Sequence, residues 1–173
     1  TSKYGRLSIL ANYKLKVLFV CENNFYSVYS GLKNRQPHNR SLIKIAKSMG
    51  LNSKKINGND VEKVFSESRK IIRNIKKNEK PYLIELTTYR HLEHCGPFKD
   101  DNLNYRPKEE LKYWFNQCPV SKYEKILIKT GLLNGKIIQN FHSKIEKEIN
   151  LAFKKARQDK FPNKKELFTN IYA

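Results

Sequence analysis

The sequence predicts an α/β fold in which a mostly parallel sheet is flanked by helices and followed by a helical carboxyl-terminal tail. One observation behind this prediction is the nearly continuous apolar run of residues 16–22, which is typical of a strand buried on both faces. Another is a clear strand over residues 82–88, directly after Pro81. Helical and extended patterns alternate between the two, and such alternation indicates a parallel sheet.

The chain up to residue 57 is predicted to contain four regular elements and one loop. They are a helix over residues 3–14, the strand over residues 16–22, a polar loop over residues 27–40, a short helix over residues 42–49 and a short strand over residues 53–57. Gly50 follows the second helix and is expected to stop it, because glycine readily adopts the backbone that ends helices.

A longer helix is predicted after the turn Asn57-Gly58-Asn59-Asp60. We expect Asn59 to cap it, with Glu62 three residues on completing a capping box, and we also interpret Asp60 as a capping residue. The apolar stripe of this helix has a 3.6-residue period. It consists of Val61, Val64, Phe65, Ser68, Ile71, Ile72 and Ile75.

Residues 89–106 lack any periodicity, and long connections of this kind are usually functional or disordered. Arg90 is expected to order this loop by pairing with Asp100 or Asp101, although it could instead face an anion. The pair Tyr105-Arg106 is expected to anchor the far end of the loop.

The remainder of the chain is predicted to be helical. Pro107 suits a first helical position, Ser121 and Glu124 resemble a capping box, and Gly131 predicts a stop. A long amphipathic helix follows, striped by Ile137, Phe141, Ile145, Ile149, Ala152 and Ala156. We therefore assign residues 1–106 to an α/β domain and residues 107–173 to a helical extension packed on the same domain.

The formal net charge is +19, from 35 Lys and Arg against 16 Asp and Glu. A charge of this size favours a nucleic-acid partner. The lysines are spread through the chain rather than gathered in one tract, however, and this is typical of solvated helix faces. We therefore keep a basic nucleic-acid-binding module as the alternative function only.

Composition also limits the setting of the protein. Hydrophobic residues make up 39% of the chain, which indicates a globular protein. No segment approaches the run of about 20 apolar residues that a membrane helix needs, and the first residues do not resemble a signal peptide. The cysteines Cys21, Cys95 and Cys118 are widely spaced and form neither a zinc motif nor a disulfide framework. We expect a cytoplasmic protein without a membrane partner.

Two adjacent amides, Asn23 and Asn24, follow the first strand, and Tyr26 comes two residues later. Ligands of parallel sheets bind beyond the carboxyl ends of the strands. Mg²⁺ prefers oxygen ligands, which an asparagine side chain and a nearby main-chain carbonyl would supply. The alternative is that the two amides only make a turn.

The loop over residues 89–106 also contains His94. An imidazole there could donate a hydrogen bond to a phosphate or to a reacting oxygen, or it could simply bind backbone. Cys95 beside it raises the alternative of a nucleophile pair, but neighbours in a loop rarely face each other correctly.

Taken in order, three segments resemble a known family. They are Cys21-Glu22-Asn23-Asn24-Phe25-Tyr26-Ser27, then Asn57-Gly58-Asn59-Asp60-Val61, then Thr88-Tyr89-Arg90 leading through His94 to Tyr105-Arg106. Their order and spacing resemble the alpha subunit of the thiamine-diphosphate-dependent 2-oxo acid dehydrogenases, which include pyruvate, acetoin and branched-chain 2-oxo acid dehydrogenases. The ending, residues 166–173, also resembles the carboxyl terminus of that family.

The resemblance implies the thiamine-diphosphate-binding fold and three site residues. Asn24, through its side-chain oxygen, and Tyr26, through its main-chain carbonyl, would bind Mg²⁺, which holds the diphosphate of the cofactor. His94 would be both a cofactor-binding and a catalytic residue. The family's motif also has a Gly-Asp-Gly half, which would lie a few residues before Thr1. We therefore expect the chain to be a carboxyl-terminal fragment of an alpha subunit.

The implied reaction is oxidative decarboxylation of a 2-oxo acid, with pyruvate the leading candidate, and acyl transfer to a lipoyl group. The implied partners are a beta subunit, which supplies the activating glutamate in an alpha2-beta2 heterotetramer, and a lipoyl-bearing acyltransferase. We expect this chain alone to be inactive, and a noncatalytic homologue is a further alternative. Because Cys95 stands where some relatives have a phosphorylated serine, we expect that regulation to be absent.

Overall fold

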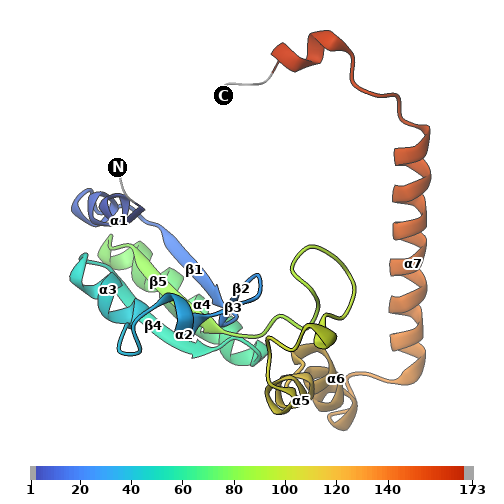
Figure 1. The fold of residues 1–173 in the computed structure, drawn as a ribbon, viewed down its shortest axis with the longest axis horizontal. Coiled ribbons are helices and arrows are strands. Elements are labelled where there is room, and N and C mark those ends of the chain that lie inside the picture. Colours follow the sequence, from blue (N-terminus) through green and yellow to red (C-terminus); the bar gives the residue numbers. More distant parts are fainter. Residues whose placement is uncertain (1–2, 170–173) are drawn as a thin grey trace. The chain divides into compact units, whose positions relative to one another are not determined.

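The structure of the protein, a computed structural model, describes the backbone of residues 3–169 and the side chains of residues 7–169. The chain divides into two compact units, Thr1–Tyr123 and Glu124–Ala173. The elements of both are labelled in Figure 1. The predicted boundary at residue 106, and the packing of the extension on the α/β domain, stay predictions. Part of the ending noted above, residues 170–173, lies outside the described residues.

The first unit is built on a three-stranded parallel sheet. Its order is β1 (Leu18–Asn23), β5 (Tyr82–Thr87), β4 (Asn52–Asn57), with β5 in the centre. The register aligns Cys21 of β1, Glu85 of β5 and Lys55 of β4 across the sheet. All three strands therefore end at the same edge, and the predicted α/β class with a parallel sheet is confirmed.

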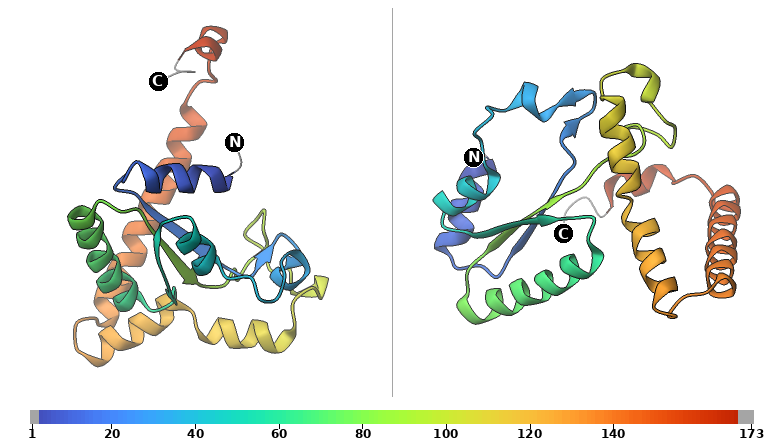
Figure 2. Two further views of the ribbon diagram at one scale, coloured as in Figure 1. Left: turned by 90° about the vertical axis from the view of Figure 1, so that its left-hand side faces the viewer. Right: turned by 90° about the horizontal axis from the view of Figure 1, so that it is seen from below.

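Helices cover the sheet on both faces, as Figure 2 shows. On one face, α4 (Val61–Asn78) packs Ile71 and Ile75 against Ile56 and Ile84 of the strands. On the other face lie α1 (Lys3–Asn12) and α3 (Leu42–Ser48). There Ala46, Leu51 and Leu83 form a second buried cluster, joined by partly buried residues of both helices. The predicted helices and strands up to residue 88 are confirmed within one to three residues at their ends.

The predicted polar loop over residues 27–40 is only partly a loop. It contains a small antiparallel hairpin, β2 (Tyr26–Ser27) and β3 (Ser30–Gly31), and one helical turn, α2 (Leu32–Arg35). Val28 takes a left-handed φ of 54° to close the hairpin. Elements this short contain too few residues to show a period, so the polar composition hid them.

The cap of α4 confirms the prediction for Asp60, whereas the capping box predicted at Asn59 is wrong. Asp60, not Asn59, is the N-cap, and its side chain accepts a hydrogen bond from the Lys63 backbone N–H. Asn59 is buried, donates to the Gln117 carbonyl at 2.9 Å and accepts from the Thr88 hydroxyl at 2.8 Å. Both residue types can cap a helix, so the choice depends on which side chain the surrounding structure uses.

The helices after the long loop begin with α5 (Lys108–Asn116) and α6 (Pro119–Lys129). The capping box predicted at Ser121 is wrong, because α6 begins at Pro119 and Ser121 lies inside its first turn. Gly131 ends the helix as predicted, with a φ of 75° and a hydrogen bond from the Leu132 N–H to the Leu127 carbonyl.

The second unit consists mainly of α7 (Gly135–Gln158), which Asn134 caps by accepting from the Ile137 N–H at 3.0 Å. The predicted long helix is thus confirmed, and a short 3-10 helix, η2 (Lys164–Phe168), follows. The apolar stripe of α7 is exposed, with Phe141, Ile145 and Ile149 each about half accessible. None of the helices in residues 3–169 has the length and apolarity that crossing a membrane would require.

Candidate functional site

The turn after β1 is shaped by the two adjacent asparagines. Asn23 Oδ1 accepts a hydrogen bond from the Phe25 N–H at 3.1 Å, and Asn24 Oδ1 accepts from the Tyr26 N–H at 3.0 Å. Phe25, which lies between Asn24 and Tyr26 in the sequence, adopts a left-handed φ of 66°. The asparagines therefore do make a turn. Because a carboxamide oxygen has two lone pairs, Asn24 Oδ1 can still coordinate a cation.

Tyr26 connects this turn to the helices beyond the long loop. Its hydroxyl donates a hydrogen bond to Glu110 Oε1 of α5 at 2.9 Å. Its ring makes edge contacts with Tyr89 and Tyr105, whose ring centres lie 6.0 and 5.7 Å away. Burial, and secondly the Glu110 carboxylate, raise the pKa of Tyr26 to about 12, so the phenol is neutral at physiological pH.

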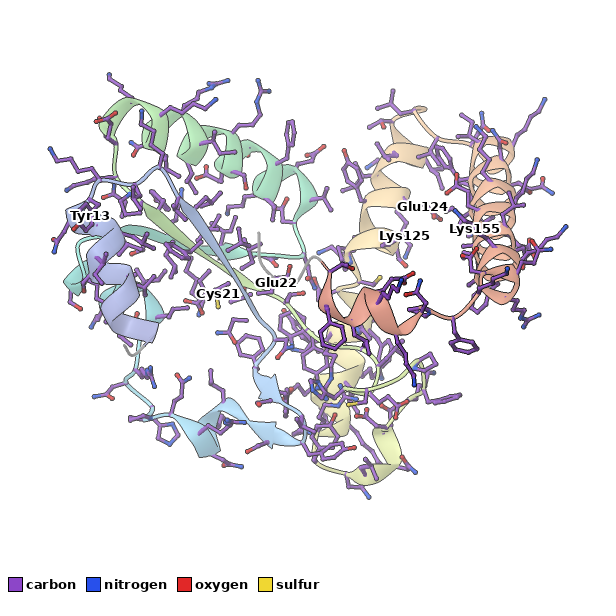
Figure 3. All side chains as sticks on the ribbon, turned by 90° about the horizontal axis from the view of Figure 1, so that it is seen from above. Tyr13, Cys21, Glu22, Glu124, Lys125 and Lys155 are labelled. Carbon is purple, nitrogen blue, oxygen red and sulfur yellow. The ribbon has the colours of Figure 1, made fainter. Side chains whose placement is uncertain are left out.

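Glu85 on the central strand β5 provides a buried carboxylate close to the turn. Glu85 is in register with Cys21, two residues before the end of β1. Only 4% of Glu85 is exposed, and its Oε1 accepts a hydrogen bond from Asn23 Nδ2 at 2.8 Å. Cys21 of β1, labelled in Figure 3, lies nearby. Its burial raises the pKa of its thiol, and the charge of Glu85 adds to this effect. Our sequence analysis did not single out Glu85, although an acid inside the apolar run Ile84-Glu85-Leu86 was a signal.

Two pockets adjoin the turn. The first measures about 550 Å³ and is lined by polar and charged side chains, among them Asn24, Arg35, Lys55 and Glu85. The second measures about 840 Å³ and is lined by Tyr26, Tyr29, Tyr105, Trp114 and Glu110, with other residues. Phe25 and Tyr26 belong to both linings, so the turn forms the wall between a polar and an aromatic hollow.

The loop over residues 89–106 is held by a network around Asp100 and Arg106, both almost fully buried. Arg106 forms an ion pair with Asp100 and donates to the Arg90 carbonyl at 2.6 Å. Arg90 donates to the Tyr105 hydroxyl at 2.6 Å and to the Val28 carbonyl of the β2–β3 turn at 2.9 Å. Arg90 thus takes the predicted ordering role, and Tyr105 and Arg106 anchor the end of the loop as predicted.

His94 lies on a different part of this loop. The segment 93–98 closes on itself, because the Glu93 N–H donates to the Phe98 carbonyl at 2.9 Å and the Phe98 N–H donates back to the Glu93 carboxylate at 3.3 Å. His94 and Cys95 are both exposed, and neither lines the two pockets next to the turn. The structure therefore unites Asn24 and Tyr26 in one turn, while the role of His94 stays a prediction.

A second histidine of the loop, His91, was missed by the sequence analysis. Its ring lies 5.0 Å from Phe115 and 6.0 Å from Tyr89. Burial, and secondly the Arg106 charge, lower its pKa and so favour the neutral ring. Its Nδ1 is buried and has no hydrogen-bond partner among the described residues. His91 therefore packs among aromatic rings, and a single histidine in a sequence gives no sign of such packing.

The donor atoms at the turn suit part of a magnesium site. Asn24 Oδ1 and the Tyr26 carbonyl are neutral oxygens, the ligand type that Mg²⁺ accepts beside carboxylates, water and phosphate. Within residues 7–169, no group of three or more His, Cys, Asp or Glu side chains could hold a metal ion. Asn24 Oδ1 and the Tyr26 carbonyl would therefore need further oxygen ligands to complete a magnesium site.

Comparison with known proteins shows the family to which the chain is similar. A family model described as "Dehydrogenase E1 component" matches residues 4–165. The chain is 25% identical over 170 residues to the pyruvate dehydrogenase E1 component subunit alpha of Rickettsia bellii, covering 98% of this chain and 51% of that protein. It is 28% identical over 170 residues to the mitochondrial 2-oxoisovalerate dehydrogenase subunit alpha of Mus musculus, covering 98% of this chain and 38% of that protein. The chain thus spans about half, or less, of the length of these relatives.

Proposed function

The chain belongs to the dehydrogenase E1 component family, and on that premise we propose that it forms part of the thiamine-diphosphate site of a 2-oxo acid dehydrogenase alpha subunit. The observation that carries this proposal is the turn after β1. It presents the Asn24 side-chain oxygen at the carboxyl edge of a parallel sheet, where ligands of such sheets bind.

In this proposal, each residue of the turn has a binding task. Asn24 Oδ1 and the Tyr26 carbonyl hold Mg²⁺, and the metal holds the diphosphate. Arg35 and Lys55 line the first pocket together with Glu22 and Glu85. Because Glu85 pairs with Lys55, Arg35 would be the basic residue that favours an anionic ligand. Bound thiamine diphosphate supplies the carbanion chemistry of the reaction, while the protein binds and orients it.

His94 is the residue we propose for proton transfer or for hydrogen bonding near the reacting group. Its exposure leaves the imidazole accessible to a substrate. A histidine side chain can both give and take a proton near neutral pH, so the residue type suits the task. Its approach to the cofactor would depend on the partner subunit that completes the site.

We propose a 2-oxo acid as the substrate, with pyruvate the leading candidate, and a lipoyl group as the acyl acceptor. The names of the relatives include both pyruvate and 2-oxoisovalerate dehydrogenase, so both acids belong in the test. The proposed partners are a beta subunit, in an alpha2-beta2 assembly, and the lipoyl-bearing acyltransferase. We propose a cytoplasmic location and expect no turnover by this chain alone.

The test uses the complete alpha subunit assembled with its beta subunit. Replacing Asn24 by alanine removes one metal ligand, so Asn24→Ala should weaken the binding of Mg²⁺ and thiamine diphosphate together. We expect a loss of about tenfold to 100-fold, or roughly 1.4–2.7 kcal/mol, in isothermal titration calorimetry. Asn39→Ala is the matched control, since Asn39 is exposed and lines neither pocket at the turn. Unchanged affinity in Asn24→Ala would show that the metal assignment is wrong.

A further inference from the structure

Glu85 is an ionisable residue buried in the middle strand of the sheet. It lies on β5 between β1 and β4, and the residue is 4% exposed. A buried charge is costly unless hydrogen bonds or an opposite charge compensate for it. We therefore ask which hydrogen bonds and opposite charges compensate for the burial of Glu85.

Two side chains from the neighbouring strands reach this carboxylate. Asn23 Nδ2 of β1 donates to Oε1 at 2.8 Å, and the Lys55 ammonium of β4 lies 3.4 Å from the same oxygen. About half of the Lys55 side chain is exposed, and ion pairs with such exposure contribute little. The shorter contact to Asn23, directly at the turn, is the more specific one.

This contact determines which way the Asn23 carboxamide points. With Nδ2 donating to Glu85, Oδ1 faces the Phe25 N–H and accepts from it at 3.1 Å. In the reversed orientation, an oxygen would face the carboxylate and an NH₂ group would face the backbone N–H, so both hydrogen bonds would be lost. Glu85 Oε1 accepts from Asn23 Nδ2, and this contact exists only in the first orientation.

The Phe25 N–H belongs to the residue with a left-handed backbone, which residues with a side chain adopt at a cost. The hydrogen bond from Asn23 helps to hold that conformation. The same turn places the Asn24 oxygen and the Tyr26 carbonyl. The chain of contacts therefore runs from Glu85 through Asn23 to the backbone that presents both oxygens.

We propose that Glu85 is a positioning residue, which orients Asn23 and thereby sets the turn that binds the metal and the diphosphate. This inference rests on the function proposed above. In it, Glu85 does not touch the cofactor and acts only through Asn23.

The first experiment measures cofactor affinity and thermal stability of the alpha–beta assembly side by side. Glu85→Ala should weaken the binding of Mg²⁺ and thiamine diphosphate about tenfold or more in calorimetry, as the loss of other outer-shell partners does. Ile84→Val is the matched control, because Ile84 is the adjoining residue of β5, is 1% exposed and packs on the opposite face. It should lower the melting temperature without changing the affinity.

A reciprocal exchange tests the route through Asn23 and serves equally well if Glu85→Ala does not fold. Asn23→Asp alone places two carboxylates against each other and should weaken cofactor binding about tenfold. Adding Glu85→Gln restores one donor and the original net charge of the pair. The double variant should therefore bind within about threefold of the parent.

Three results would overturn the inference. If Glu85→Ala lowers the melting temperature but keeps parental affinity, as Ile84→Val does, then Glu85 only stabilises the sheet. If the double variant binds as weakly as Asn23→Asp, the hydrogen bond is not the route. If Asn24→Ala keeps parental affinity while Glu85→Ala loses it, the metal assignment fails first, and Glu85 acts by a path other than this turn.

Discussion

The turn after β1 and the segment 93–98 carry the predicted site residues, and they hold them in opposite ways. Asn23 and Asn24 are tied by hydrogen bonds to the turn's own backbone, and Asn23 also to the buried Glu85 on the central strand. The segment 93–98 is closed by Glu93 and Phe98 alone, and its His94 side chain is exposed. One region thus takes its geometry from the sheet, and the other from its own few residues.

Under the proposed function, this difference would correspond to two tasks. Metal and phosphate ligands must sit in a preset geometry, which strand ends of a sheet provide. A group that meets the substrate can stand on a loop that a rigid scaffold carries. We infer that cofactor holding and substrate contact are divided between these two regions, and the following variants test that division.

The largest effect is expected where the long loop is anchored. Asp100→Ala leaves the buried Arg106 guanidinium without its carboxylate, so we expect a loss of about 3–5 kcal/mol in the free energy of unfolding. Chemical denaturation measures it. Asp101→Ala is the matched control, because Asp101 lies 3.7 Å from the same Arg106 group but its side chain is 42% exposed. It should cost less than about 1 kcal/mol. Equal losses in both variants would contradict the anchoring role of Asp100.

A smaller effect, on rate rather than on stability, is expected at His94. His94→Gln should leave the free energy of unfolding within about 0.5 kcal/mol, because the side chain is exposed. If His94 serves in proton transfer, steady-state turnover by the alpha–beta assembly should fall at least about 100-fold. Because His94 is also predicted to bind the cofactor, cofactor affinity should fall too, but by less than the turnover. A turnover equal to the parental value would remove His94 from the site.

The smallest effect is expected at the tyrosine that connects the turn with α5. Tyr26→Phe removes the hydrogen bond to Glu110 and should cost about 0.5–1.5 kcal/mol at neutral pH. Folding raises the pKa of Tyr26 from about 10 to about 12. The contribution of the neutral Tyr26 phenol to the free energy of unfolding is therefore complete below pH 10 and is lost as the pH rises toward 12.

The pH dependence gives the sharper measurement of that contact. Thermal unfolding between pH 9 and about 12 should show parental stability falling more steeply than that of Tyr26→Phe, since only the parent has this phenol to ionise. Parallel profiles would mean that neither the burial of Tyr26 nor its contact with Glu110 raises the pKa of the phenol in the folded protein.

Much of the fold followed from patterns between near neighbours in the chain. The apolar run 16–22, the stripe of α4 and the glycine at 131 each predicted the element that the structure has. The hairpin over residues 26–31 was missed because strands of two residues have no detectable period. Both Asn59 and Asp60 were predicted to cap α4, because local sequence cannot show that Asn59 is buried against other parts of the chain.

The same difference between local patterns and contacts of distant residues applies to the site. Asn24 and Tyr26 were proposed as ligands from the family resemblance, and the structure places them in one turn, while their role as metal ligands stays a prediction. Glu85 and His91 were not found. The partner of Glu85 is 62 residues away in sequence, and His91 packs against aromatic residues of another element.

The amino-acid sequence therefore specified the α/β class, most helices and strands, the family and the two adjacent amides, because all of these depend on the order and spacing of residues along the chain. The contact of Asn23 with Glu85, the burial of Asn59 and the exposure of His94 arose only in the folded protein. The physical reason is that hydrogen bonds and burial depend on distances in space. The packing of β5 between β1 and β4 sets those distances for Asn23 and Glu85.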